Sequence, residues 1–414
     1  MSTHLSRRAL LSTAIVGASA FSGCLSALRS VRSDRPLPTT PEGRWTQHGA
    51  DAANTFTASV SAPPQGNLAW TSAAFTRWTP VLADGTVYTT NFDPSHEGSA
   101  IALDAQDGSE QWRTTLGGEG DHGRALVDGR LIVVDETELH ALNRETGEIV
   151  WQRSLEPVQR SGRVGYAPER LAVDDRSGTI VVPSRNGLNA LGATDGEPRW
   201  TTTEVSPGSA TPAIHNGTIY LIDRHAEADS LAALAVDDGS IRWTRSLAEP
   251  VVSADPVVTD HGVLIVDSGS LAVYDADTGS RRRVTALDAV ETTATVTVAA
   301  DAGTAFVATR EGLFAVDIEA GTTRLLHDGM VDPEGFCVGA ETVVAMVDGS
   351  PYVADDNVVT ITAFDRNTGE PRWNYVTEGF HTLTIPPILA DGAVFFATSR
   401  LNALAALGDV SPSG

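Results

Sequence analysis

Short apolar runs separated by polar turns recur along the chain. The clearest copy runs from Leu139 to Trp151: an apolar stretch, a five-residue polar turn from Asn143 to Gly147, and a second stretch that ends at Trp151. Asn opens a turn of this kind, and Gly supplies the positive φ that closes it. Two apolar stretches around such a turn predict a β-hairpin.

Copies of this hairpin follow one another at a spacing of about 40 to 50 residues. Four further complete copies place a Trp four residues after the turn Gly: Gly108 and Trp112, Gly196 and Trp200, Gly239 and Trp243, Gly369 and Trp373. Two degraded copies keep the turn, but have Arg283 and Leu325 at the Trp place. A repeat of this length is typical of propellers and solenoids.

A second pair of strand signals precedes the hairpins. Asp84-Gly85, Asp128-Gly129 and Asn216-Gly217 each stand between two apolar runs. Asp-Gly and Asn-Gly are the strongest short signals for a tight hairpin turn. Each repeat therefore predicts four antiparallel strands, which make one blade of a β-propeller.

The two ends of the repeat region complete each other. The last unit, around Asp391-Gly392 and Leu401 to Leu404, has three strands, and the missing strand lies near the start of the chain at Gly66 to Trp70. Pairing the two ends closes the ring and removes two exposed sheet edges. The predicted fold is all-β, an eight-bladed propeller of four-stranded antiparallel blades over residues 44–408, with a C-terminal tail at 409–414.

The first residues resemble an export signal. Ser6-Arg7-Arg8-Ala9-Leu10-Leu11 resembles a twin-arginine motif, and Phe21-Ser22-Gly23-Cys24 resembles a lipobox with Phe in place of the usual Leu. The resemblance implies a signal peptide at residues 1–23, lipidation of Cys24, and a lipid-anchored location at the extracytoplasmic face of the cell membrane. The Pro-containing residues 24–43 predict a flexible tether. An uncleaved N-terminal anchor is the alternative.

The charge balance bears on partners and on habitat. The 414 residues carry a formal net charge of -24 and include no Lys. This balance disfavours nucleic acid and anionic membrane surfaces as partners. An acidic, Lys-free surface favours a halophilic archaeon, because molar salt shortens the Debye length to about 3 Å and screens self-repulsion. Compositional drift in a GC-rich genome is the alternative.

The repeated hairpin Leu-x-Ala-Leu-Asp-x-x-Thr-Gly-x-x-x-Trp resembles the repeat of the quinoprotein-type (PQQ-like) β-propeller family. The stretch from Trp45 to Thr55 looks like the segment that often precedes the first blade of that family, and the resemblance extends from Trp45 to Leu407. It implies that the repeat Trp side chains dock between neighbouring blades, with looser packing near Arg283 and Leu325. The implied docking residues are Trp70, Trp112, Trp151, Trp200, Trp243 and Trp373.

Enzyme chemistry finds little support in the residues. Quinone enzymes of this fold carry adjacent Cys residues and a Ca²⁺ held by carboxylate and amide oxygens, whereas the two Cys here are Cys24 and Cys337. The acidic turns lack the full Asp-x-Asp-x-Asp-Gly run, and turn capping explains their Asp residues. Gly-x-Ser-x-Gly, His-Glu-x-x-His and Walker sequences are absent. We predict no catalytic residue, metal site or cofactor, with PQQ as the alternative, and a buried Cys337.

The segments that lead into the innermost strand of each blade are the candidate binding residues, because they border the central channel of a propeller. They are rich in Arg, His and aromatic residues, and Trp, Tyr and Arg are enriched at binding hot spots. The candidates are Arg77, Trp78, His122, Arg124, Tyr166, Asp255 and His381. They predict a site for an acidic or aromatic group, such as part of a peptide. The alternative is that Trp78 and Tyr166 only fill the channel.

The sequence thus predicts a protein-binding scaffold whose partners are the membrane, through the lipid anchor, and a membrane or exported protein. The nearest functional analogue by resemblance is the propeller lipoprotein that supports outer-membrane protein assembly. An archaeon has no outer membrane, so only the scaffold role would carry over. A redox or sensor protein that binds a quinone or small ligand in the channel is the alternative. Asn216-Gly217-Thr218 also matches an N-glycosylation sequon, although turn chemistry explains it equally.

Overall fold

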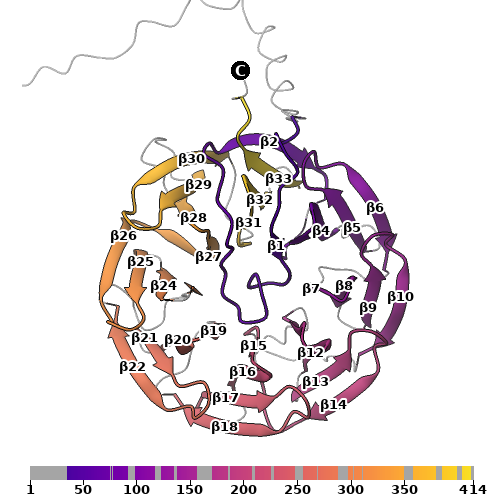
Figure 1. Ribbon diagram of the computed structural model, residues 1–414, viewed down its shortest axis with the longest axis vertical. Coiled ribbons are helices and arrows are strands. Elements are labelled where there is room, and N and C mark those ends of the chain that lie inside the picture. The colour runs from indigo at the N-terminus through magenta and orange to yellow at the C-terminus, as the bar shows by residue number, and fades with distance from the viewer. Residues whose placement is uncertain are drawn as a thin grey trace, which may run out of the picture.

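The computed structural model describes residues 35–74, 76, 78–91, 98–116, 123–134, 138–155, 170–184, 187–207, 210–224, 228–247, 255–267, 269–287, 297–301, 303–309, 311–348, 358–378, 385–398 and 403–411. All regular structure in these residues is β-strand, and eight sheets stand around one axis (Figure 1). Over the same ranges, no helix has the length and apolar character that a bilayer crossing requires.

Each blade contains four antiparallel strands from the axis to the rim, and in blades 1 to 7 these four strands follow one another along the chain. Blade 1 consists of β3 (Val81–Ala83), β4 (Thr86–Asn91), β5 (Ser99–Asp104) and β6 (Glu110–Thr115). Blade 2 consists of β7 (Gly123–Val127), β8 (Arg130–Val134), β9 (Glu138–Asn143) and β10 (Ile149–Ser154). Blade 3 consists of β11 (Ala172–Asp174), β12 (Thr179–Ser184), β13 (Gly187–Gly192) and β14 (Pro198–Thr202). Blade 4 consists of β15 (Ala213–His215), β16 (Thr218–Asp223), β17 (Ser230–Ala235) and β18 (Ile241–Ser246).

The second half of the ring repeats this order. Blade 5 consists of β19 (Val257–Thr259), β20 (Gly262–Asp267), β21 (Ser270–Tyr274) and β22 (Arg281–Ala286). Blade 6 consists of β23 (Thr297–Ala300), β24 (Thr304–Ala308), β25 (Gly312–Asp317) and β26 (Thr323–Asp328). Blade 7 consists of β27 (Val331–Val338), β28 (Thr342–Asp348), β29 (Val358–Asp365) and β30 (Pro371–Glu378). Blade 8 consists of β31 (Ile388–Ala390), β32 (Ala393–Thr398), β33 (Ala403–Gly408) and β2 (Asn67–Ser72).

The ring closes as the sequence predicts. Strand β2, from the start of the propeller, pairs with β33 at its end, with Asn67 opposite Gly408 and Ser72 opposite Leu404. Figure 1 shows the two ends of the colour scale side by side in this blade. Pairing the chain ends inside one sheet leaves no open gap in the ring, and the prediction of eight blades is confirmed.

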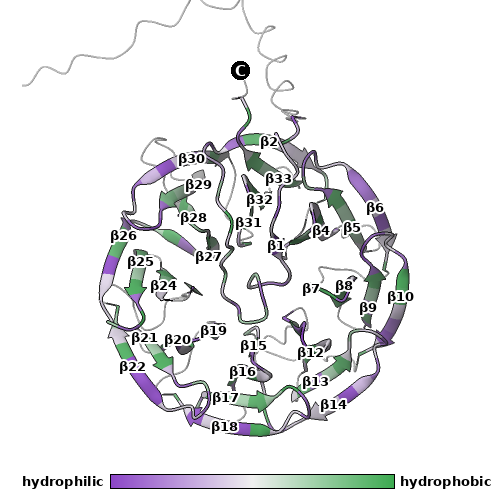
Figure 2. Cartoon of the chain, viewed as in Figure 1, coloured by the Kyte–Doolittle hydropathy of each residue, from purple (hydrophilic) through white to green (hydrophobic). Residues whose placement is uncertain are grey.

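The inner strands of each blade are more deeply buried than the rim strands. Inner strands such as β8 and β9 are almost fully buried, because each blade is covered on both faces by its neighbours. Rim strands such as β10 expose most of their residues, and hydrophilic colour gathers along the rim in Figure 2. The apolar runs of the sequence therefore mark inner strands, and the Trp-containing stretches mark the rim.

A β-bulge aims the repeat Trp at the next blade. In blade 2, Ile149 pairs with Leu142 and Trp151 pairs with Ala141, so one extra residue lies between them. Such a bulge turns the following side chain out of the regular alternation. The indole of Trp151 then lies over the turn of blade 3, where an added Cβ on Gly196 would come 2.7 Å from Cε3.

Six blade junctions share this arrangement. In each, the indole Nε1 donates a hydrogen bond to a backbone carbonyl of the following blade, which satisfies both groups as they are buried. In five junctions the acceptor lies in the turn before the rim strand, and for Trp373 it is Pro63, which precedes the rim strand β2. The pairs are Trp70 to Ala105 (3.2 Å), Trp112 to Arg144 (3.0 Å), Trp151 to Ala193 (3.0 Å), Trp200 to Val236 (2.7 Å), Trp243 to Ala276 (3.0 Å) and Trp373 to Pro63 (2.7 Å).

The two remaining junctions differ from each other. Arg283 holds the Trp place after a bulge of the usual kind, and its Nη1 donates to Ala320 O at 3.2 Å. In blade 6 the bulge comes later along the strand, so Arg324 rather than Leu325 pairs with the central Ala of the repeat. The assignment of Leu325 to the Trp place is therefore wrong: its side chain is 48% exposed.

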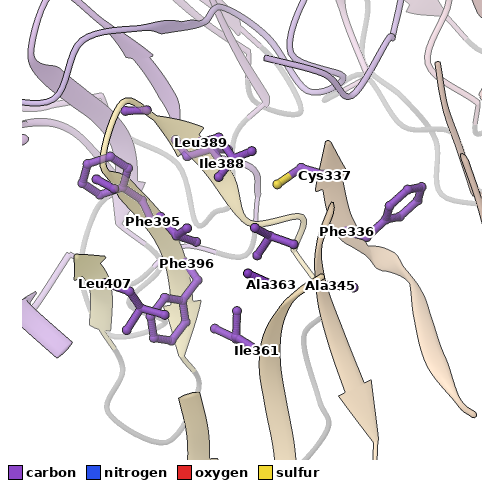
Figure 3. Close-up of a cluster of buried hydrophobic side chains, with 14 of the residues drawn as sticks. Phe336, Cys337, Ala345, Ile361, Ala363, Ile388, Leu389, Phe395, Phe396 and Leu407 are labelled. Carbon is purple, nitrogen blue, oxygen red and sulfur yellow. The ribbon is translucent and has the colours of Figure 1, made fainter. Parts of the chain in front are cut away.

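The largest apolar cluster joins blades 6, 7, 8 and 1. Figure 3 shows part of it, with Cys337 on β27 close to Ile388 and Leu389 on β31. Cys337 is fully buried, and burial raises the pKa of its thiol well above the ordinary value. This burial confirms the prediction that Cys337 is a small core residue. A neutral thiol in apolar surroundings is also unreactive.

Candidate functional site

The axis of the ring contains an extended stretch of chain, residues 42–61, which we call the axial segment. Figure 1 shows it descending from the rim beside blade 8, looping through the middle of the ring and returning. Its first part includes β1 (Arg44–Trp45), which adds a fifth strand to blade 1 through the pairs Arg44 with Ala83 and Trp45 with Leu82. Trp45 and Phe56 of this segment are buried at 0% and 2% exposure.

The axial segment also bonds to the innermost strand of blades 2 to 7 and to the turn after β31 in blade 8. Gln47 contributes its side-chain amide, which both donates to and accepts from the backbone of Val173. The backbone bonds are Leu126 N to Thr46 O (2.7 Å), Val258 N to Ala53 O (2.9 Å), Ala300 N to Thr55 O (2.9 Å), Val338 N to Phe56 O (3.0 Å) and Asp391 N to Glu42 O (2.7 Å), and Ile214 N donates to Ala52 O. One segment therefore touches all eight blades.

These bonds lie toward one end of the axis. Leu126, Ile214 and Val258 each stand two residues before the hairpin turn that joins the innermost strand to the next strand. We call this end, where the tight hairpin turns lie, the turn end, and we call the opposite end, where the innermost strands begin, the loop end. The axial segment closes the turn end of the axis.

His48 extends from the axial segment into a cluster of polar residues that stand just before innermost strands. Its Nδ1 lies 2.9 Å from Thr79 Oγ1, and its Nε2 lies 3.0 Å from Arg170 Nη1 and 3.4 Å from Asp255 Oδ2. Arg170 Nη1 lies 3.4 Å from the same Asp255 oxygen. We call His48, Trp78, Arg170 and Asp255 the axial cluster.

The charge state of the cluster follows from its burial. Burial and the positive charge of Arg170 lower the pKa of His48 below its usual 6.5. Arg170 can only donate, so His48 Nε2 accepts and its proton lies on Nδ1. Burial would raise the pKa of Asp255, but the positive charge of Arg170 and the hydrogen bond from the Thr211 N–H favour the charged carboxylate, and the pKa is lowered. The cluster is therefore a neutral imidazole beside an Arg–Asp ion pair.

Trp78 completes the cluster, and the buried side chain of Arg124 donates a hydrogen bond to its backbone carbonyl. The Arg170 guanidinium carbon lies 5.9 Å from the Trp78 ring centroid. Arg124 is 4% exposed and donates at 3.3 Å to the carbonyl oxygens of both Trp78 and Thr79. It also donates to the hydroxyl of Thr76 at 3.1 Å. Arg124 thus fixes the backbone that presents Trp78 and does not face solvent.

Of the predicted channel residues, the structure brings three into one network. Trp78, Arg124 and Asp255 come from blades 1, 2 and 5 and are joined through Arg170 and the 76–79 backbone. The other candidates, Arg77, His122, Tyr166 and His381, and the lipidation candidate Cys24, lie outside the described residues. Their part in binding stays a prediction.

Sequence reasoning missed His48, Arg170 and Thr211. His48 belongs to a segment that precedes the first blade, so nothing in the sequence placed it on the axis. Arg170 and Thr211 each stand two residues before an innermost strand, as Asp255 does. The turn between β11 and β12 has no Asp-Gly or Asn-Gly signal, and the residue predicted for the approach to blade 3, Tyr166, therefore falls several residues early. Aligning all eight innermost strands would have found Arg170 and Thr211, but not His48.

The described residues do not fit the quinone site that the fold family implies. Within the described ranges, no three His, Cys, Asp or Glu side chains gather closely enough to hold a metal ion. Cys337, the one Cys within the described ranges, is buried in the apolar cluster that includes blades 7 and 8. Asp255, the carboxylate of the cluster, already accepts from Arg170 and from Thr211 N at 2.7 Å. We derive no step through a quinone.

The fold and the axial arrangement define a closed eight-bladed propeller built from PQQ-like repeats. A family profile described as "Outer membrane protein assembly factor BamB" matches residues 55–138 and 135–375. The chain belongs to this family.

Relatives share part of the chain. The BamB assembly factor of Shewanella oneidensis is 27% identical over 191 residues, which are 43% of this chain and 48% of that protein. The assembly factor of the same name from Yersinia pestis is 25% identical over 220 residues, which are 46% of this chain and 53% of that protein. The chain thus spans about half the length of these curated relatives.

Solved structures share the fold over more of the chain. The quinohemoprotein alcohol dehydrogenase of Comamonas testosteroni superposes with a TM-score of 0.61 at 14% identity, covering 90% of this chain and 82% of that one. At that identity the likeness speaks for the propeller fold alone.

Proposed function

We propose that this protein is an exported, lipid-anchored propeller that binds another membrane or exported protein at the outer face of the cytoplasmic membrane. Two relatives of its family are named as assembly factors, and binding of protein partners is the part of that role which this fold can carry without catalysis. The proposal takes no step from the quinone enzymes that share the fold, because the described residues do not fit their site.

The observation that carries the proposal is the asymmetry of the axis. The turn end is closed by the axial segment, which bonds to every blade. Toward the loop end, the side chains of His48 and Arg170 are each 19% exposed and that of Asp255 is 10% exposed. A ring that is stiffened from within and presents Arg and Trp on one side suits a rigid docking platform, since these residue types dominate binding hot spots.

The residues that precede the axial segment lie at the rim of the ring, where a tether to the membrane would attach. Arg35 N donates to Ala69 O at 3.1 Å, and Leu37 N donates to Gln106 O at 2.8 Å, so residues 35–37 lie along blades 8 and 1. From Cys24 to Arg35 an extended chain reaches about 35 Å. A lipid on Cys24 would hold the ring by its rim and leave the loop end free for a partner.

The test is capture from the membrane. Full-length protein, solubilised in detergent after crosslinking in intact cells, should bring down the same membrane or exported protein in repeated preparations. A Cys24→Ser variant should leave the membrane fraction and lose that partner, while its thermal unfolding stays unchanged. The proposal fails if the wild-type protein captures nothing beyond what an unrelated lipid-anchored protein captures, or if the Ser variant stays in the membrane fraction.

A further inference from the structure

Arg170 uses only one of the three nitrogens of its guanidinium for hydrogen bonds to the described residues. Every hydrogen bond that it makes within the described residues leaves from Nη1, toward His48 Nε2 at 3.0 Å, Thr211 Oγ1 at 3.3 Å and Asp255 Oδ2 at 3.4 Å. Its Nε and Nη2 donate to none of the described residues, and the side chain keeps 19% exposure. Those two donors form the edge of a guanidinium that matches both oxygens of a carboxylate.

A second unused donor belongs to Trp78, whose ring centroid lies 5.9 Å from the Arg170 guanidinium carbon. All eight Trp residues of the chain fall within the described ranges, and seven of them donate Nε1 to a carbonyl oxygen. Trp78 is the exception: its Nε1 is buried and has no hydrogen-bond partner. Buried N–H groups are nearly always satisfied. An acceptor from outside the chain would complete this one.

We propose that Arg170 and Trp78 form a binding site for a carboxylate, occupied by the free C-terminus of an extended partner polypeptide. The inference rests on the proposed scaffold function and names the group by which the partner is held. Asp255 does not take the place of the ligand, because it is fixed by Thr211 N at 2.7 Å and by Nη1, on the other edge of the guanidinium.

The axial segment explains why a chain end suits the site better than an internal stretch of polypeptide. Residues 42–61 close the turn end with bonds to all eight blades, so a chain that reaches Arg170 along the axis cannot continue past it. The acidic hairpin turns, among them Asp84, Asp128 and Asp260, lie at that closed end. The incoming carboxylate therefore approaches from the side that they do not occupy.

The site is tested with matched acids and amides on the purified full-length protein. The peptide probe is fluorescein-labelled Gly-Ser-Gly-Ser-Phe with a free C-terminus, and its control is the same peptide amidated. The small-molecule probe is 3-phenylpropionate, and its control is 3-phenylpropionamide. We expect the peptide acid to bind at least about tenfold more tightly than its amide, because the fork of Arg170 pairs with a charged bidentate acceptor.

Two variants remove one donor group each. Arg170→Lys keeps the charge and loses the fork, and Trp78→Phe keeps a ring and loses the N–H; each should reduce the preference for acid over amide by about tenfold or more. Arg153→Lys is the control, since Arg153 lies on the rim strand β10 and pairs with Glu197. Thermal unfolding of each variant shows whether it is folded, and Trp78→Phe decides the matter if Arg170→Lys does not fold.

Each outcome has one meaning. Preference for the peptide acid, with or without preference for 3-phenylpropionate, supports a polypeptide C-terminus as occupant. Preference for 3-phenylpropionate alone overturns that occupant, and equal binding of acids and amides overturns the carboxylate site. Acid binding that survives both variants also overturns it. If a partner is captured from membranes but the protein binds acids and amides equally, the carboxylate site is overturned and the scaffold function stands. If the protein prefers acids but captures no partner, the scaffold function is overturned and the carboxylate site stands.

Discussion

The junction between blades 1 and 2 and the junction between blades 6 and 7 solve the same packing problem in different ways. At the first, the indole of Trp112 lies on the turn of the next blade and donates to Arg144 O at 3.0 Å. At the second, the strand backbone takes that place: an added Cβ on Gly369 would come 2.2 Å from Leu326 O. Arg324 Nη2 donates at 3.4 Å to Arg366 O, the carbonyl that corresponds to Arg144 O.

The position of the β-bulge explains the difference. With the bulge directly before the Trp, the side chain is turned toward the neighbouring blade and separates the two backbones. In blade 6 the bulge lies after Leu325, and the backbone itself approaches the turn. The Arg366 guanidinium pairs with Asp301 and lies 5.1 Å from the Phe306 ring centroid, which adds an ion pair and a cation–π contact to this junction. The close backbone approach takes the place of the indole at this junction, and the expectation of looser packing stays a prediction.

The largest expected effect is the loss of stability when a junction Trp is removed. Trp112→Ala should lower the free energy of unfolding by about 3–5 kcal/mol, because it leaves a cavity and an unsatisfied carbonyl. Arg283→Ala, at the corresponding place in blade 5, should cost less than about 1 kcal/mol, since it removes a solvent-exposed hydrogen bond. Denaturant unfolding of both variants measures the difference. Equal costs would show that the indole adds nothing beyond what Arg supplies.

The turn Gly under each indole offers a sharper test. Gly147 and Gly129 both have positive φ, of 74° and 71°. A Cβ on Gly147 would lie 2.6 Å from Trp112 Cε3, whereas a Cβ on Gly129 would meet nothing within 4 Å. Gly129→Ala should cost about 1–2 kcal/mol for the left-handed backbone alone, and Gly147→Ala about 1–3 kcal/mol more for overpacking. Matching shifts of the denaturation midpoint would contradict the indole-on-turn contact.

Restoring the missing indoles should succeed at one junction and fail at the other. Arg283→Trp places an indole after a bulge of the usual kind, opposite a turn that ends in Gly321, and should stabilise the ring by about 0.5–2 kcal/mol. Leu325→Trp should give no gain, because residue 325 points to solvent in blade 6. Thermal unfolding of the two variants side by side gives the answer. A gain from Leu325→Trp would show that the bulge can move to suit the side chain.

The smallest effect is expected at the blade 6–7 hydrogen bond. Arg324→Ala removes the 3.4 Å bond to Arg366 O and leaves the close backbone contact in place. We expect a loss of no more than about 1 kcal/mol. Hydrogen exchange of the amides of β26 and β29 would detect a larger local effect. A loss of stability as large as that of Trp112→Ala would show that Arg324, and not the backbone contact, holds this junction together.

Much of the axial cluster could not be predicted from the sequence. The types of residue at the approaches to the innermost strands pointed to Trp78 and Asp255, and the structure joins both to Arg170. The sequence could not show that Arg124 is buried against the backbone of Trp78. An Arg that binds a ligand and an Arg that supports the backbone look the same in a sequence. It also could not find His48, because no local signal shows that a segment before the first blade will run along the axis.

The sequence by itself determined the repeat, the blade number and the closure of the ring. Each of these depends on pairing between neighbouring strands or on a period, and both are written locally in turns such as Asn143 to Gly147 and in the Trp that follows. The tertiary structure alone decided where the bulge falls in blade 6 and which side chains meet on the axis. Contacts on the axis join His48 to blades 1, 3 and 5; they form only once all blades are in place, so no stretch of sequence records them.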